Sequence, residues 1–248
     1  MLAADAPPKD PSRISGMFDA IAARYDFLNH VLSGGLDKRW RRRAVEGLNL
    51  TGRETVLDLC TGTADLAIAC ATAFPLRAKR VIGIDFSRAM LDVGRAKIER
   101  ANEAKPVHLI RGDAARIPLA DGSVDAATIA FGIRNVERPD RACREVVRVL
   151  RQGGVLVILE FSLPQAAALR AIYLWYFKNV LPRVGRIVSG HRSAYTYLPE
   201  SVEAFPSPQA FSGQLREAGF GTVRAVALTF GIVYMFVAVK DAAPVRML

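Results

Sequence analysis

The sequence predicts an α/β protein with a mostly parallel, Rossmann-like sheet of seven strands, helices on both faces and an antiparallel pair of strands at the end. Short apolar runs alternate with helical patterns between residues 55 and 160, which is typical of βαβ units. Two further apolar runs, at 222–229 and 232–239, are separated by Phe230 and Gly231, so these strands should pair antiparallel. Parallel strands need crossover connections, and the intervening helices should therefore cover both faces.

The first fifty residues predict helices. Residues 1–11 include three prolines and predict a disordered tail. From residue 12 to about residue 50 apolar side chains recur at helical spacing, and Gly34 and Gly35 interrupt the pattern. A second helix is therefore expected at 36–47, and residues 38–43 place five cations around Trp40.

The central segment alternates strands and helices. Strands are predicted at 55–59, 80–84, 107–111, 124–130 and 154–160, and helices at 64–74, 87–101 and 139–150. Ser87 suits a helix N-cap, and Pro139 suits the first turn of a helix. Gly153 and Gly154 are expected to close the last of these helices before the fifth strand. A helix at 208–218, ended by Gly219, leads into the final two strands.

The length of 248 residues fits one large domain with additions. We expect the cofactor-binding core at 51–162, preceded by the N-terminal helical segment at 12–50. Residues 163–200 form a helical insert, residues 201–240 complete the same domain, and residues 241–248 form a tail. The insert is aromatic and cationic, because residues 161–199 contain no Asp or Glu. Such a segment suits a membrane surface or an apolar pocket, although a lid packed on the core is an equal alternative.

Composition limits the classes of function. The net charge of +10 fits nucleic acid, anionic lipid or an acidic substrate, or a composition that is simply rich in Arg. No apolar run is long enough to span a membrane, and the N-terminus lacks a secretory signal, so a cytoplasmic protein is expected. The spacings of Cys60, Cys70 and Cys143 predict neither a zinc site nor a disulfide framework, and no metal is expected.

Two sequence stretches predict a nucleotide-like site. VLDLCTGTAD at 56–65 is an apolar strand followed by a turn of small residues, and VIGID at 81–85 is a strand that ends in Asp85. The turn would let backbone N–H groups approach a ligand, and Asp85 would accept hydrogen bonds from two ribose hydroxyls. The alternative is an ordinary turn with a helix-capping Asp. After the third strand, Asp113 could accept from an adenine amino group while the Ala114 N–H meets a ring nitrogen, although Gly-Asp is also common in turns.

The antiparallel ending separates two classes of α/β protein. An NAD-binding domain would continue with βα units, whereas class I S-adenosylmethionine-dependent methyltransferases end in an antiparallel pair. The sequence therefore favours S-adenosylmethionine over NAD. Methylation of an aromatic ring carbon would require a ring hydroxyl to lose its proton, aided by a base or by a cation that stabilises the phenolate. Arg134, after the fourth strand, could supply the cation and Asn135 could orient a ring oxygen; a surface arginine is the alternative.

The chain from about residue 12 to residue 239 resembles the menaquinone/ubiquinone biosynthesis C-methyltransferase family. The matching segments are MFDAIAARYDFLNHVLSGGLDKRWR at 17–41, VLDLCTGTADLA at 56–67, GIDFSRAML at 83–91, FGIRNV at 131–136, GGVLVILEFSLP at 153–164 and YTYLPESVEAFPS at 195–207. The FGIRN loop differs from the Pro-Pro-Tyr or Pro-Pro-Phe turn of amino-methylating enzymes. The resemblance implies S-adenosylmethionine-dependent methylation of a ring carbon of a prenylated quinol.

The resemblance also implies site residues. The expected cofactor-binding residues are Asp58, Gly62, Thr63, Asp85, Phe86, Asp113, Ala114 and Ala130. The expected catalytic residues are Arg134, Asn135, Tyr25, Tyr195, Tyr197 and His191, with His30 as a further candidate base. Each tyrosine could instead be a core aromatic with its hydroxyl bonded. Many relatives have Gly where this chain has Ala64, and some have Ser where it has Ala130.

A lipid substrate would account for the cationic segments. The expected partners are a prenylated quinol and, peripherally, the inner face of an anionic membrane; a homo-oligomer is also considered, and nucleic acid is not expected. The alternatives are a methyltransferase for another small phenol or lipid, an RNA or DNA methyltransferase suggested by the net charge, and a cofactor-binding regulator without turnover. The residues do not distinguish a naphthoquinol from a benzoquinol.

Overall fold

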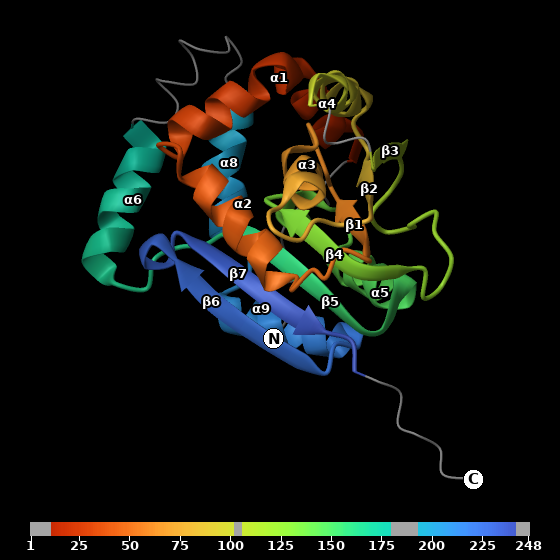
Figure 1. Cartoon of the computed structure of the whole chain (residues 1–248). Coiled ribbons are helices and arrows are strands. Elements are labelled where there is room, and N and C mark those ends of the chain that lie inside the picture. Colours follow the sequence, from red (N-terminus) through yellow and green to blue (C-terminus); the bar gives the residue numbers. More distant parts are fainter. Residues whose placement is uncertain (1–10, 102–105, 180–192, 242–248) are drawn as a thin grey trace.

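The strands form one seven-stranded sheet in the computed structural model, which describes residues 11–101, 106–179 and 193–241 (Figure 1). The strand order is β3-β2-β1-β4-β5-β7-β6. Parallel pairing joins β3 to β5 through β2, β1 and β4, and β7 pairs antiparallel with both β5 and β6. The strands are β1 (Thr55–Leu59), β2 (Arg80–Asp85), β3 (Val107–Arg111), β4 (Val124–Ala130), β5 (Leu150–Phe161), β6 (Thr222–Leu228) and β7 (Val233–Val239).

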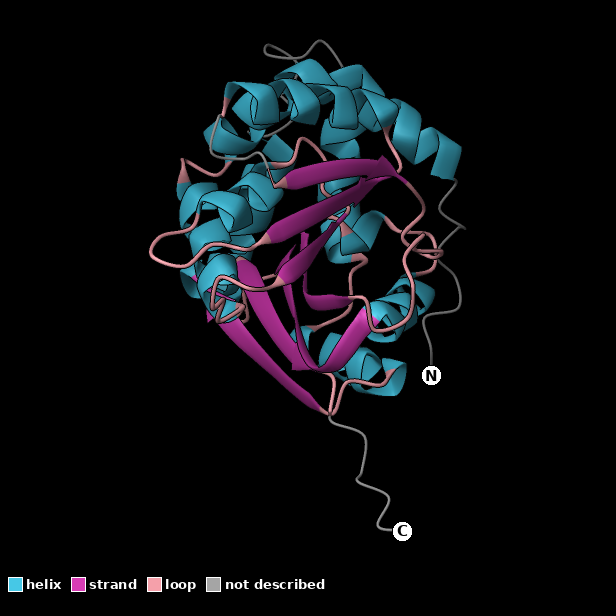
Figure 2. Cartoon of the chain, turned by 45° about the vertical axis from the view of Figure 1, so that its right-hand side comes forward, coloured by secondary structure: helices cyan, strands magenta, loops and turns pink. Residues whose placement is uncertain are grey.

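Helices cover both faces of this sheet (Figure 2). One face packs against α2 (Leu36–Gly47), α3 (Asp65–Thr72) and α4 (Arg88–Arg100), and the other against α5 (Pro139–Val149) and α9 (Pro208–Ala218). Successive side chains of β5 point to opposite faces of the sheet, and both sets are apolar because both faces are covered by helices. Leu156 and Ile158 pack into the core shared with α5 and α9, whereas Val157 and Leu159 pack into the core shared with α2 and α3.

Three further helices pack together beside the sheet. These are α1 (Pro11–Leu32), α6 (Ala167–Asn179) and α8 (Ser193–Glu203), and α1 lies across the top of Figure 1 against α4. Their small core joins Ile21 of α1, Met90 of α4, Tyr173 of α6 and Val202 of α8. No helix among the described residues is both long enough and apolar enough to cross a membrane.

The predicted elements are confirmed with small shifts at their ends. Ser87 caps α4 by accepting from the Met90 N–H at 3.1 Å, Pro139 begins α5, and Gly219 ends α9 with a φ of 115°. The predicted tails lie outside the described residues except for Pro11 and Asp241, and residues 180–192 of the insert also lie outside them.

One prediction about backbone geometry is wrong. Gly153 and Gly154 do not close a helix, because α5 ends at Val149 and β5 begins at the next residue. The two glycines lie inside β5, where the pairing with β4 shifts from Val124 opposite Leu150 to Ala126 opposite Val155. A Cβ on Gly154 would lie 2.8 Å from the Arg151 carbonyl oxygen, so the tight path of this bulge requires glycine.

Candidate functional site

A cavity of about 290 Å³ lies at the carboxyl ends of β1, β2, β3 and β4, where open α/β sheets bind their ligands. Most of the predicted cofactor-binding residues line it: Gly62, Asp85, Phe86, Asp113, Ala114 and Ala130. Helix α1 contributes Ile14, Ser15, Phe18 and Tyr25 to the same wall. The cavity therefore combines the strand ends of the sheet with a roof from the N-terminal helix.

The turn after β1 has the compact backbone that its small residues predict. Cys60, Gly62 and Ala64 all have left-handed backbone, with φ between 55° and 66°. Left-handed backbone favours glycine, so Ala64 adopts this conformation at a cost that glycine would not have. The Thr61 N–H donates to the Ile84 carbonyl at 3.0 Å, so the turn is fastened to the neighbouring strand.

Asp58 lies beneath this turn and is not among the residues that line the cavity. Its buried carboxylate accepts from the hydroxyls of Thr61 at 2.5 Å and Thr128 at 2.7 Å. Burial raises the pKa of Asp58 to about 6, although both hydroxyl bonds act in the opposite direction. These contacts give Asp58 a role in holding the turn.

Asp85 lines the cavity at the end of β2. One carboxylate oxygen accepts from the Gly62 N–H at 2.8 Å, and the other accepts from the Ser87 N–H at 2.9 Å. Burial raises the pKa of Asp85, against the effect of these backbone donors. Each carboxylate oxygen has a second lone pair, so the side chain can also accept from a bound hydroxyl.

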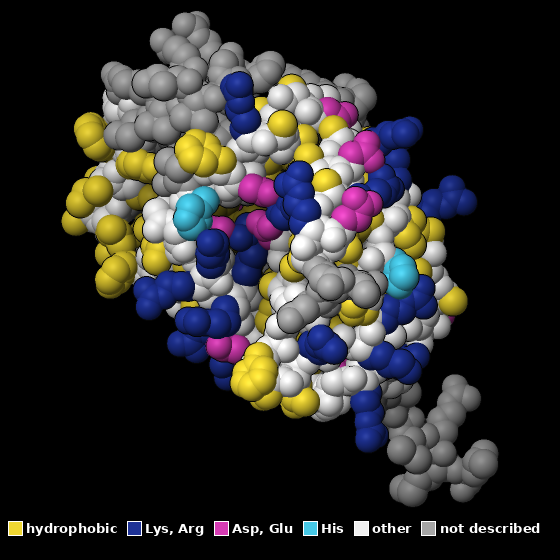
Figure 3. Space-filling model, turned by 45° about the horizontal axis from the view of Figure 1, so that its top comes forward, with side chains coloured by type: hydrophobic (Ala, Val, Ile, Leu, Met, Phe, Trp, Pro, Cys, Tyr) yellow, Lys and Arg dark blue, Asp and Glu magenta, His cyan; other side chains and the backbone are white. Residues whose placement is uncertain are grey.

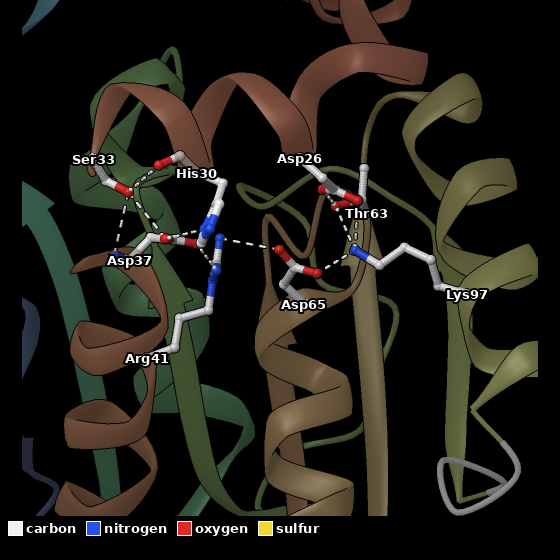
Figure 4. A network of polar contacts seen from close by, with 8 residues as sticks. All are labelled: Asp26, His30, Ser33, Asp37, Arg41, Thr63, Asp65 and Lys97. Atoms are coloured by element: carbon white, nitrogen blue, oxygen red, sulfur yellow. Dashed lines mark hydrogen bonds and ion pairs between the residues drawn. The ribbon is translucent and has the colours of Figure 1, made fainter. Parts of the chain in front are cut away.

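Thr63 also lies outside the cavity lining and belongs to a polar network beside it, which Figure 4 shows. Its hydroxyl donates to Asp26 of α1. Lys97 of α4 donates to Asp26 at 2.8 Å and also pairs with Asp65 at the start of α3. Arg41 of α2 pairs with Asp65 at 3.1 Å. We call Asp26, Thr63, Asp65 and Lys97 the clasp, because they join α1 to the turn after β1, which we call the cofactor turn.

The other half of Figure 4 surrounds Asp37 of α2. Asp37 is buried and accepts from Arg41 at 2.5 Å and from Ser33 at 3.0 Å, and it pairs with His30 at 3.2 Å. His30 is about half exposed and lines neither the cofactor cavity nor its neighbour described next. The structure therefore places this candidate base away from both cavities.

A second cavity of about 370 Å³ adjoins the first. Its wall is largely apolar and comes from α1, α2, α6, α8, the loop after β4, the end of β5 and the η3 turn (Thr229–Gly231). Phe18, Tyr25 and Phe131 line both cavities. Phe131 stacks on Phe161 with their ring centroids 4.5 Å apart, and Trp40 packs beside both rings. The two cavities therefore share an aromatic wall.

Arg134 is a buried residue of the second cavity and not a surface arginine. It lies in the short η2 helix (Ile133–Asn135) that follows β4. Its Nη1 donates to Glu160 at 2.7 Å and to the Phe131 carbonyl at 2.6 Å, and its Nε donates to Ser201 at 3.3 Å. The guanidinium also lies 5.4 Å from the centre of the Phe161 ring.

The remaining catalytic candidates divide into two groups. Tyr197 lines the second cavity and Asn135 lines the first. The Tyr197 hydroxyl donates to the Asn135 side-chain oxygen at 3.1 Å. Burial raises the pKa of both Tyr25 and Tyr197, so these phenols stay protonated at neutral pH. Tyr195 falls in α8, but its side chain is outside the described part of the structure, as is all of His191.

Glu160, Phe131 and Phe161 were expected from the sequence at the ligand-binding edge of the sheet, but no role was predicted for any of them. Glu160 is fully buried, pairs with Arg134, and accepts from the Phe161 N–H at 2.8 Å. An acid inside the apolar run GGVLVILEF was a signal for a buried partner, because a lone buried carboxylate is costly. The loop after β4 meets the turn after β1 so closely that a Cβ on Gly132 would clash with the Cys60 Cβ.

This architecture and site define a class of protein. A seven-stranded sheet that ends in an antiparallel pair, with a small-residue turn and an acid at the ends of the first two strands, is that of a class I S-adenosylmethionine-dependent methyltransferase. A solved SAM-dependent methyltransferase from Aquifex aeolicus shows the same fold, with a TM-score of 0.57 and 20% identity over 93% of this chain and 98% of that one.

Within that class, the chain belongs to the ubiE/COQ5 methyltransferase family, whose family model matches residues 8–240. The chain is 45% identical to the ubiquinone/menaquinone biosynthesis C-methyltransferase UbiE of Geobacter sp. (strain M21), over 92% of this chain and 96% of the relative. It is 46% identical to a demethylmenaquinone methyltransferase of Thermus thermophilus, over 87% of this chain and 96% of the relative. The resemblance inferred from the motifs is thereby confirmed.

Proposed function

We propose that the protein transfers a methyl group from S-adenosylmethionine to a ring carbon of a prenylated quinol, converting demethylmenaquinol to menaquinol. The observation that supports this most strongly is the apolar cavity beside the cofactor cavity, with Phe18, Tyr25 and Phe131 in both walls. Two relatives are named for this chemistry, and one name includes ubiquinone, so a benzoquinol is a second substrate to test.

The first cavity fits the cofactor. Asp85 presents a buried carboxylate at the end of β2 with acceptor capacity for ribose hydroxyls, and the small side chains at Gly62 and Ala130 leave room for the ligand. Asp113 and Ala114 line the same cavity after β3 and would hold the adenine. S-adenosylmethionine supplies an already activated methyl group, so the protein has mainly to position the two reactants.

The second cavity provides the groups that a quinol ring needs. A ring hydroxyl must lose its proton to a base or to water so that electron density moves to the carbon that accepts the methyl group. The bond between sulfur and the methyl group breaks as the new carbon–carbon bond forms, S-adenosylhomocysteine is the leaving group, and the methylated carbon then loses its own proton to restore the aromatic ring. We propose that the positive charge of Arg134 stabilises the resulting phenolate and that Asn135, held by Tyr197, orients a ring oxygen. Tyr25 borders the ring at the junction of the cavities, and Tyr195 and His191 remain candidates.

A prenylated substrate resides in a bilayer, so the proposal includes a location. We propose that the protein works at the cytoplasmic face of the membrane, as expected from its cationic segments. Arg41 lies in the cationic segment 38–43, but we do not propose it for membrane contact. Its side chain pairs with Asp37 and Asp65 and is only 11% exposed. Arg42 and Arg43 of the same helix are 71% and 67% exposed.

The test is a methylation assay with labelled S-adenosylmethionine. Demethylmenaquinol and the benzoquinol precursor are offered in parallel, each kept reduced, with total RNA as a third acceptor. We expect label in the naphthoquinol, and label in both quinols would extend the activity to ubiquinone. Label in RNA with neither quinol modified would contradict the proposal.

A further inference from the structure

Three large apolar side chains are exposed on α6 and η3, two elements that contribute residues to the wall of the apolar cavity. Ile172 of α6 is 65% exposed and lines the cavity, and Trp175 lies one helical turn further along α6 with 61% exposed. Phe230 of the η3 turn is 84% exposed and directly follows Thr229, another lining residue. We call Ile172, Trp175 and Phe230 the rim.

A hydrogen bond of the preceding residue, Thr229, fixes the turn that carries Phe230. The Trp40 Nε1 donates to the Thr229 hydroxyl at 2.9 Å, which fastens η3 to α2. Phe230 itself has left-handed backbone, with φ 58° and ψ 23°. A bulky side chain in this conformation is unfavourable, and the cost is not recovered by burial in the chain itself. The Phe230 ring therefore stays exposed at the surface, on a turn that is fixed to α2.

Exposed cations accompany the rim on α6 and α2, and exposed acids, Glu200 and Glu203, lie on the neighbouring α8. Arg170 lies on α6, within a sequence stretch of 39 residues, 161–199, that has no acid. Arg39 of α2 is exposed next to Trp40, which lines the apolar cavity, whereas Lys38 lines the open groove that also contains Phe74 and Leu76. In Figure 3 hydrophobic side chains gather on the side of α6, and Lys and Arg side chains follow toward the middle of the view.

We infer that the rim is a docking surface for an anionic lipid bilayer and forms the entrance for the prenyl chain. Tryptophan favours the interface between headgroups and acyl chains, and exposed cations beside it would contact anionic headgroups. The rim is continuous with an apolar cavity, so a chain leaving the bilayer would enter the protein without crossing water. This inference rests on the proposed quinol substrate.

The first experiment measures binding to vesicles. The rim variant combines Trp175→Gln and Phe230→Asn, neither of which lines a cavity, and Asn tolerates left-handed backbone. The control combines Phe74→Gln and Leu76→Gln, two exposed residues after α3 that line a separate open groove between α1, α2 and α3. Full-length protein is sedimented with vesicles of phosphatidylcholine with or without phosphatidylglycerol.

We expect the unmodified protein and the control to bind vesicles that contain phosphatidylglycerol, and the rim variant to bind about tenfold or more weakly. Equal binding of the rim variant and the control would overturn the inference. A change in oligomeric state of the rim variant, with unchanged vesicle binding, would also overturn it and would make the rim a contact between copies of the chain.

The second experiment separates the inference from the proposed function. Each variant is assayed with a prenylated quinol embedded in vesicles and with a short-chain quinol dissolved in buffer. We expect the rim variant to lose activity with the embedded quinol and to keep it with the dissolved one. Equal activity of rim variant and control with the embedded quinol would overturn the inference. If no quinol is methylated by the unmodified protein, the proposed function fails, whereas vesicle binding still tests the rim.

Discussion

Arg134 lies in a largely apolar cavity, where it pairs with the buried Glu160. The carboxylate of Glu160 accepts from both the side chain and the backbone N–H of Arg134, at 2.7 and 3.3 Å. Removing one partner of such a buried pair usually costs about 3–5 kcal/mol, because a charge is left uncompensated. In a site that must stabilise a phenolate, the balance between these two charges should also set the acidity of the bound quinol.

Glu160→Gln should therefore change the pH dependence of catalysis. Without the carboxylate, the Arg134 charge acts more strongly on the quinol hydroxyl and lowers its pKa, so the pH–rate profile should move to lower pH. The variant should also unfold at lower urea concentration. The control is Glu145→Gln, which breaks the pair of Glu145 with Arg148 at 2.8 Å on α5. A profile that coincides with that of the control would show that Glu160 only stabilises the fold.

Asp58 should make stability depend on pH. Its pKa is raised from 3.8 to about 6, so between these values the folded state binds a proton that the unfolded state has lost. The stabilising effect is present below about pH 4 and is lost as pH rises to about 6; two pKa units correspond to about 3 kcal/mol. Asp58→Asn should flatten this dependence in urea unfolding between pH 4 and pH 7.

An exposed carboxyl provides the comparison. Asp92→Asn, on α4, removes an acid that is about half exposed. If Asp58→Asn and Asp92→Asn change the pH dependence by the same amount, the account of Asp58 is wrong.

Residue positions at the ends of strands were the most predictable part of the site. Asp85, Asp113 and Ala130 line the cavity because parallel strands end at one edge of the sheet. Thr63 faces elsewhere because the left-handed residues of the turn redirect the chain in a way that spacing does not specify, whereas Asp58 lies within β1 and bonds to Thr61 and Thr128. The burial of Arg134 depends on Glu160 and Ser201, which are distant in sequence.

At the scale of elements, α1 is a roof that polar contacts attach to the sheet domain in addition to its small apolar core. The clasp joins it to the cofactor turn and to α4, and Asp19 of α1 accepts from the Ser87 hydroxyl at the start of α4. These contacts place Phe18 and Tyr25 in the walls of both cavities. The helical pattern of residues 12–50 predicted the helices, but it could not predict this attachment, because its partners come from three other elements.

Lys97→Met should weaken cofactor binding. The change leaves Asp26 and Asp65 without their shared cation, so α1 should close less firmly over the cofactor cavity. We expect the Kd for S-adenosylmethionine, measured by titration calorimetry, to rise about tenfold, which corresponds to about 1.4 kcal/mol. Arg95→Met on the same helix breaks a more exposed pair with Asp92 and should leave the Kd unchanged. Equal affinities for the two variants would contradict a role of the clasp in binding.

At the scale of the whole molecule, the fold places two cavities of different chemistry side by side. The cofactor cavity follows from the sheet and was predictable from the order of strands and helices. The apolar cavity was predicted only in part. The aromatic insert at 163–200 was expected to suit an apolar pocket or a membrane surface, but the walls from α1, α2 and η3 carry no local signal. The Gly153–Gly154 bulge was missed for a similar reason, since glycine suits both a helix end and a bulge.

The measurement that tests the central claim most directly is a crystal structure of the protein with S-adenosylhomocysteine and a prenylated quinol bound together. The account predicts the nucleoside against Asp85 and Asp113, the quinol ring beside Arg134 and Asn135, and contacts of both ligands with Tyr25 and Phe131 at the junction. A quinol bound elsewhere, for instance in the open groove formed by α1, α2 and the loop after α3, would contradict it.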